Sequence, residues 1–87
     1  LTYKIATTSG PEPDWKPILA FHDGTRTFIQ FPKGVTTRPP LFVKSGNTSA
    51  IVNYRTQDEY YVIDRVIDAA VLKFGTDPQT IVTISSL

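Results

Sequence analysis

The chain has 87 residues, 40% of them hydrophobic and 20% charged, which suits one small folded domain with a modest core rather than a disordered segment. Nine basic residues balance eight acidic ones, so the net charge of +1 gives no electrostatic case for nucleic acid or an anionic membrane as a partner. The absence of cysteine excludes disulfides, and no apolar run approaches the roughly 20 residues that span a bilayer.

The first part of the chain predicts a strand, a long loop and a hairpin. Residues 2–7 alternate weakly, as in a strand, and the Pro- and Gly-rich residues 9–14 follow as a loop and the best candidate for a mobile segment. A hairpin is expected over residues 18–31, because Asp23-Gly24 is typical of a tight turn. The core face of its second strand should carry Thr27, Ile29 and Phe31.

The middle of the chain predicts a second loop, a short strand and a longer hairpin. Residues 32–40 contain three prolines and one glycine, which exclude a strand interior and suit a crossover between sheets. A strand over 41–44 and a turn at 45–48 lead into a hairpin over 50–63, whose polar corner is residues 56–59. The core face of this hairpin should consist of Ala50, Val52, Tyr54, Tyr61 and Ile63.

The last part of the chain admits two interpretations. The apolar residues of 66–74 fall at helical spacing after a capping Asp64, whereas several of them are β-branched and favour a strand. We predict a brief helical turn over 65–68 and a strand over 70–74, followed by a turn and a final strand over 80–85. Short strands spaced by turn signals predict an all-β fold, either a small antiparallel β-sandwich or a small barrel.

No constellation of residues predicts catalysis, a metal site or a cofactor. His22 is the only histidine, and both it and Asp23 are expected in the hairpin turn, because a triad or metal site needs further groups that converge. Asp58 and Glu59 should occupy a solvated corner, and Asp64 should cap a turn or pair with a nearby arginine. The five glycines are scattered singly, so no phosphate-binding loop is expected.

Most of the aromatic rings are expected in the core, because the basic residues are too dispersed for an RNA-binding sheet. Trp15 is different, since it lies at a loop exit beside charged residues and Pro17. Both a core position and an anchor for a partner remain open for this ring.

Six short segments carry a resemblance to a known family. In chain order they are residues 21–27 (FHDGTRT), 31–32 (FP), 40–43 (PLFV), 52–55 (VNYR), 60–65 (YYVIDR) and 71–75 (VLKFG). Together and in this order they resemble the C-terminal domain of the TrbG/CagX family, which includes the ninth VirB protein of type IV secretion systems. His22 departs from the acidic residue expected there, an exchange that a turn should tolerate.

The resemblance implies a sandwich rather than a barrel, with residues 1–87 forming a single C-terminal domain of a longer secreted protein. In the family this domain belongs to the outer-membrane core complex of the channel, in the periplasm of Gram-negative bacteria. The implied partners are a peptide of a small outer-membrane lipoprotein, a TrbI-type envelope-spanning subunit and ring neighbours of the same kind. The outer membrane would be reached through these partners, and neither enzymatic activity nor direct nucleic-acid binding is expected.

A different class of function stays open beside the resemblance. The chain could be an immunoglobulin-like module that recognises peptide or carbohydrate in an unrelated secreted protein. Exposed aromatic rings lining a groove would favour this alternative, whereas an open sheet edge would favour the channel subunit.

A sandwich built of hairpins has to end in sheet edges. The first and last strands, 2–7 and 80–85, carry neither a proline nor an inward charge that blocks pairing, so we expect them to be edges. Because the family binds an extended segment of a lipoprotein, we expect that segment to add a strand there. The residues expected at this partner surface are Tyr3, Ile5, Trp15, Val82 and Ile84.

Overall fold

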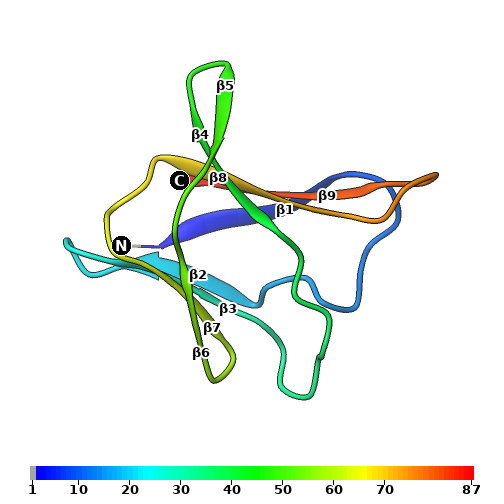
Figure 1. Cartoon of the computed structure of the whole chain (residues 1–87), viewed down its shortest axis with the longest axis horizontal. Helices are drawn as coiled ribbons and strands as arrows, with labels where there is room; N and C mark the ends of the chain where they lie inside the picture. Colours follow the sequence, from blue (N-terminus) through cyan, green and yellow to red (C-terminus); the bar gives the residue numbers. More distant parts are fainter. Residues whose placement is uncertain (1) are drawn as a thin grey trace.

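A computed structural model describes residues 2–87, which form nine strands, without a helix, in two antiparallel sheets (Figure 1). The first sheet has the order β1-β9-β8-β4-β5 and the second sheet the order β2-β3-β7-β6. This confirms the predicted all-β fold and its antiparallel pairing. The strands are β1 (Tyr3–Ser9), β2 (Leu19–His22), β3 (Thr27–Gln30), β4 (Leu41–Ser45), β5 (Thr48–Ile51), β6 (Arg55–Gln57), β7 (Tyr60–Ile63), β8 (Ala69–Phe74) and β9 (Thr80–Ser86).

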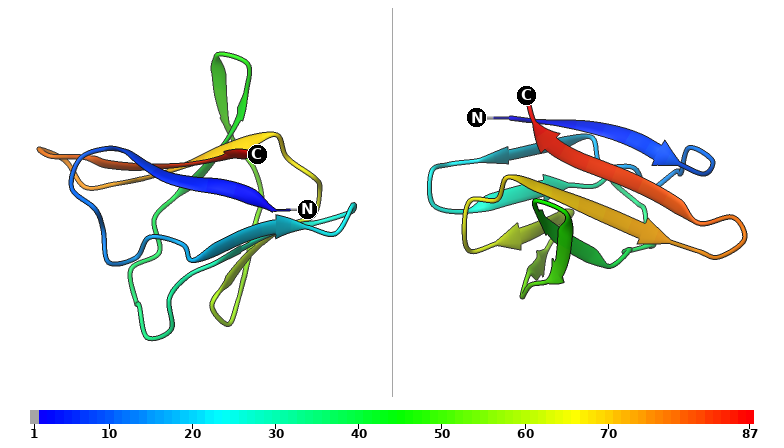
Figure 2. Two further views of the ribbon diagram at one scale, coloured as in Figure 1. Left: turned by 180° about the vertical axis from the view of Figure 1, so that it is seen from behind. Right: turned by 90° about the horizontal axis from the view of Figure 1, so that it is seen from above.

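The core lies between the two sheets, which form the two layers visible in Figure 2. Burial alternates along β3 and β9, as expected for strands with one face on the core and one face toward solvent. Hydrophobic burial of these inward side chains is the main force that holds the layers together. The largest buried side chains include Phe31, Ile29, Tyr61 and Ile63 around the second sheet, and Leu41, Leu72, Val82 and Ile84 in the first.

The hairpin of β2 and β3 is confirmed, with Ala20 paired to Ile29. Asp23 explains the tight turn, because its Oδ1 accepts hydrogen bonds from the backbone N–H groups of Thr25 (2.9 Å) and Arg26 (2.8 Å). The predicted inward face of β3 is also confirmed, since Thr27 and Ile29 are fully buried.

The predicted hairpin over residues 50–63 is wrong in its first strand. β5 pairs with β4 in the first sheet, whereas β6 pairs with β7 in the second sheet, so the chain changes sheets at residues 52–54. The alternation continues through this switch because Val52 and Tyr54 still pack against the core. Ala50, which was predicted to be core, is exposed. The alternation therefore predicted the inward side chains correctly from Val52 onward, but it failed at Ala50 and did not identify the partner strand.

The predicted helical turn at 65–68 is also wrong, because this segment is an irregular link between β7 and β8. Its carbonyl groups accept hydrogen bonds from other strands: the Thr27 hydroxyl donates to the Arg65 carbonyl (2.9 Å) and the Tyr3 hydroxyl to the Ile67 carbonyl (2.6 Å). Ile67 is 4% exposed and faces the core. Tertiary partners thus replace the local bonds of a helix, and β8 follows close to the predicted strand.

The two long loops close the sandwich. The predicted crossover at 32–40 is confirmed, since it links β3 of the second sheet to β4 of the first, and the Tyr61 hydroxyl donates to the carbonyl of Pro39 in it (2.7 Å). The loop after β1 contains Trp15, which is 3% exposed and lies edge-on to Phe74 with 6.3 Å between the ring centroids. Of the two interpretations of Trp15, the structure supports the core position.

Candidate partner-binding surfaces

The sheet edges differ from the predicted ones in one respect. β1 is an edge strand, as expected, but β9 lies inside the first sheet between β1 and β8, so the prediction of an edge at β9 is wrong. Val82 and Ile84 are fully buried and face the core. Both backbone sides of β9 are already paired, which leaves no place for a partner strand there.

The remaining predicted partner residues lie on β1 and in the loop after it. Tyr3 is 8% exposed, its ring lies 5.8 Å from that of His22, and its hydroxyl is bonded to the Ile67 carbonyl. Ile5 is half-buried, pairs with Ile84 and packs against the core, and the Trp15 ring is buried. The five predicted residues therefore contribute core contacts, and what β1 offers to a partner is its backbone edge.

The free edge of β1 is partly closed. An isolated bridge joins Thr2 to Phe21 of β2, and the register with β9 shifts between Thr7 and Ser9. Such a bulge twists an edge strand and weakens its capacity to pair. The middle of β1 is the part of this edge that stays available.

The opposite edge of the first sheet is β5, whose four residues are all exposed. Figure 1 shows the β4–β5 hairpin projecting from the body of the sandwich. Ile51 at the end of β5 is 79% exposed, although it is a large apolar side chain. The alternation over residues 50–63 predicts one hairpin, and that prediction leaves no edge at β5.

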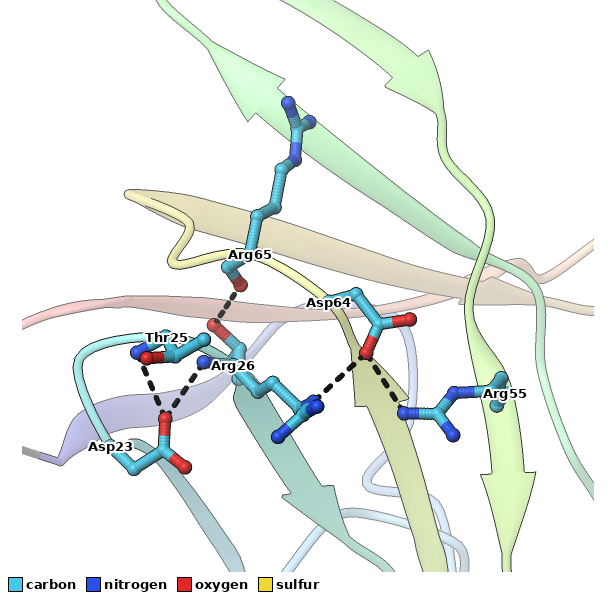
Figure 3. A network of polar contacts seen from close by, with 7 residues as sticks. Asp23, Thr25, Arg26, Arg55, Asp64 and Arg65 are labelled. Atoms are coloured by element: carbon cyan, nitrogen blue, oxygen red, sulfur yellow. Dashed lines mark hydrogen bonds and ion pairs between the residues drawn. The ribbon is translucent and has the colours of Figure 1, made fainter.

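A hollow of about 410 Å³ lies beside β5, at the place where the chain passes from the first sheet to the second. On its floor Asp64 Oδ1 accepts from Arg55 Nη2 (2.8 Å) and Arg26 Nε (3.1 Å), as Figure 3 shows. The predicted pairing of Asp64 with a nearby arginine is thus confirmed for Arg55. The lining residues are Ile51, Val52, Asn53, Ile63, Asp64 and Arg65.

A second hollow, of about 320 Å³, lies on the outer face of the second sheet. Its wall contains Phe21 and Phe28, stacked with 5.1 Å between centroids, and Tyr60, which lies edge-on to Phe28 at 6.4 Å. Gln57 and Asp58 complete its polar side. All three rings are half-buried, so this hollow is a shallow aromatic surface.

The candidate catalytic groups do not converge. His22 Nδ1 accepts a hydrogen bond from the backbone N–H of Gly24 (3.1 Å), and both lie in the β2–β3 turn. The backbone N–H groups of Arg26 and Thr25 lower the pKa of Asp23 by hydrogen bonding to its carboxylate. Burial raises the pKa of Tyr61, whose hydroxyl is bound in the core. The pKa shift of Asp23 is thus explained by the turn, and that of Tyr61 by core packing.

Residues 2–87 also lack two other features, a metal-binding cluster and a membrane-spanning helix. No three side chains among histidine, aspartate and glutamate are gathered so that they could hold a metal ion. The described part of the chain also contains no long apolar helix of the kind that crosses a membrane.

Comparison with known proteins identifies the family. The family model CagX, described as conjugal transfer protein, matches residues 1–86. The chain belongs to the CagX family. It is also similar to a probable conjugal transfer protein TrbG from Sinorhizobium fredii (strain NBRC 101917 / NGR234), with 39% identity over 71 residues. That match covers 79% of this chain and 26% of the relative, so the chain spans about a quarter of the relative's length.

Proposed function

We propose that this chain is a structural, non-enzymatic subunit of the outer-membrane core complex of a type IV secretion or conjugation channel. The observation that carries the proposal is the match of the conjugal transfer family model to residues 1–86. The chain would form a C-terminal domain of a longer periplasmic protein and pack in a ring with its own copies and a TrbI-type subunit.

The same proposal includes a lipoprotein partner at β1. A short extended segment of a small outer-membrane lipoprotein would add a strand beside Lys4 and Ile5, where the edge is not closed by the bridge at Thr2 or by the bulge after Thr7. Backbone hydrogen bonds would provide most of the affinity, because the nearby side chains Tyr3 and Trp15 face the core.

Titration of the isotope-labelled chain with the N-terminal peptide of the lipoprotein encoded beside it tests the partner directly. Amide shift changes are expected along β1 and in its neighbour β9. Changes confined to the loop 32–40 and the Asp23-Gly24 turn, with β1 silent, would show that loops are the binding surface.

A transfer assay tests the wider role. Donor cells that lack the segment corresponding to this chain should lose conjugal transfer, and a copy supplied on a second plasmid should restore it. Normal transfer without the segment would contradict the proposal.

The alternative of a recognition module in an unrelated protein is supported by one observation, the aromatic hollow of Phe21, Phe28 and Tyr60. Membership in the CagX family argues against it, because the alternative requires an unrelated protein. In a channel subunit, the same rings would suit a contact with a neighbouring subunit, since aromatic residues are enriched at protein interfaces.

A further inference from the structure

The β5 edge is short, but it carries no residue of the kinds that block edge pairing. Its sequence, Thr48–Ile51, carries no proline and no charge, and its register with β4 runs without a shift from Ser45 to Phe42. All four residues are exposed, and only the β4 side of the strand is paired. The other side therefore presents backbone N–H and C=O groups that another strand could bind.

An apolar contact is available at the end of this edge. Ile51 is 79% exposed and lies on the rim of the 410 Å³ hollow, with half-buried Val52 next to it. A side chain of an added strand would reach Ile51 and the hollow at once, since neighbouring strands lie about 4.8 Å apart. Covering this isoleucine removes apolar surface from water, which favours an occupant.

The charges around the hollow favour an acidic occupant. Asp64 is already shared by Arg26 and Arg55, and Arg65 extends away from it in Figure 3. Among residues 2–87 the Arg65 and Lys44 side chains take part in no ion pair. A smaller hollow of about 140 Å³ brings these two cations together with Asp68. Four cationic side chains thus surround two carboxylates.

We propose that the β5 edge and the adjoining hollow form a second docking surface, which binds an extended acidic segment of a partner protein as an added strand. A carboxylate of that segment pairs with Arg65, and an apolar side chain covers Ile51. This surface lies at the opposite edge of the first sheet from β1, so it goes beyond the lipoprotein contact and does not depend on it.

A peptide fits this surface better than a nucleic acid. No aromatic ring lines the hollow, so bases have nothing to stack on, whereas an unpaired strand edge specifically binds an extended backbone. The excess of positive charge around the hollow is also small, because the two carboxylates offset part of the charge of the four cationic side chains.

The probe is a short capped peptide that alternates valine and glutamate, added to the isotope-labelled chain. Saturable amide shift changes are expected in β5 and at residues 63–65, with β1 silent. The same peptide with N-methylated amides keeps its side chains but cannot form strand hydrogen bonds, so its binding should be lost. A peptide that alternates valine and lysine should bind at least about tenfold more weakly.

Two protein variants with the same change in net charge localise the effect. Arg65→Glu should weaken binding of the valine–glutamate peptide by about tenfold or more. Lys33→Glu, at an exposed position in the loop 32–40, should leave the affinity within about twofold, because this loop lies away from the β4–β5 hairpin in Figure 1 and salt screens the distant charge.

Several results would overturn the inference. These are no saturable binding, shifts that concentrate in β1, equal loss of affinity in both variants, or undiminished binding of the N-methylated or lysine peptide. Tighter binding of a single-stranded oligonucleotide to the same residues would overturn it in favour of nucleic acid. None of these results bears on conjugal transfer or on the lipoprotein titration, which test the proposed function separately.

Discussion

The two edges of the first sheet differ in how firmly the rest of the molecule holds them. β1 has seven residues, and it is fixed by its ladder with β9, by the bridge at Thr2 and by the bond from the Tyr3 hydroxyl to the Ile67 carbonyl. β5 has four exposed residues, and its ladder with β4 is supported only by a turn in which the Thr48 hydroxyl donates to the Ser45 carbonyl (2.8 Å).

The β1 edge therefore contributes more to the stability of the fold, whereas the β5 edge is more available to a partner. Residues that contact β1 belong to the core, so a change among them should affect the whole fold. Residues of β5 contact little else, so a change there should alter the surface and leave the fold intact. Substitutions near the two edges test this contrast.

Truncation of an isoleucine beside β1 and of one in β5 should give very different results. Ile84→Ala, at a fully buried position of β9 beside β1, should lower the free energy of unfolding by about 2–5 kcal/mol. Ile51→Ala, in exposed β5, should change it by less than about 0.5 kcal/mol. Urea denaturation followed by tryptophan fluorescence measures both, and similar losses for the two variants would contradict the contrast.

The hydrogen bond between the Tyr3 hydroxyl and the Ile67 carbonyl, which anchors β1, can be tested by removing the hydroxyl oxygen. Tyr3→Phe leaves the Ile67 carbonyl without its hydrogen bond and should cost about 1–3 kcal/mol. Tyr60→Phe is the matched control, because the Tyr60 hydroxyl forms no hydrogen bond to residues 2–87, and it should cost less than about 0.5 kcal/mol. Equal midpoints of thermal unfolding for the two variants would show that the β1 anchor contributes nothing.

The ion pairs on the β5 side should contribute little. Asp64→Asn removes two exposed pairs, with Arg26 and Arg55, and should cost about 0.2–1 kcal/mol for each. Because surface pairs are screened, the difference from the unaltered chain should shrink between low salt and about 1 M salt. A loss that is large and independent of salt would mean that Asp64 has a structural role beyond these pairs.

The smallest effect concerns pH. Backbone hydrogen bonds lower the pKa of Asp23 in the folded chain, so its stabilising contribution is fully present above the unfolded pKa of about 3.9 and is lost as pH falls through the folded pKa. Asp23→Asn should therefore show a shallower loss of stability below about pH 4 than the unaltered chain. Parallel acid titration curves for the two proteins would refute this assignment.

The sequence predicted those elements whose signals are local. The β2–β3 hairpin follows from the turn chemistry of Asp23-Gly24 and from alternation within four-residue strands. The crossover at 32–40 follows from its prolines, which cannot continue a strand. Both signals act within a few residues, so no knowledge of distant partners is needed.

The errors arose where distant partners decide the outcome. The alternation through residues 50–57 is the same whether the chain stays in one sheet or changes sheets, so the open β5 edge could not be found. The interior position of β9 depends on its meeting β1 from the far end of the chain. Burial of Trp15 likewise depends on Phe74, which lies far away in sequence. The hollow at Arg65 exists only when these long-range contacts have formed.

The change of sheet at residues 52–54 has a consequence under mechanical load. A partner that pulls on the β4–β5 hairpin cannot peel β5 away on its own, because the three linking residues 52–54 pass the force to β6 and its ladder with β7 in the other layer. The pull is then shared by both layers of the sandwich through one covalent link. A tether attached at β5 would strain the domain as a unit, while the same tether on β1 would load only the first sheet and the bridge at Thr2.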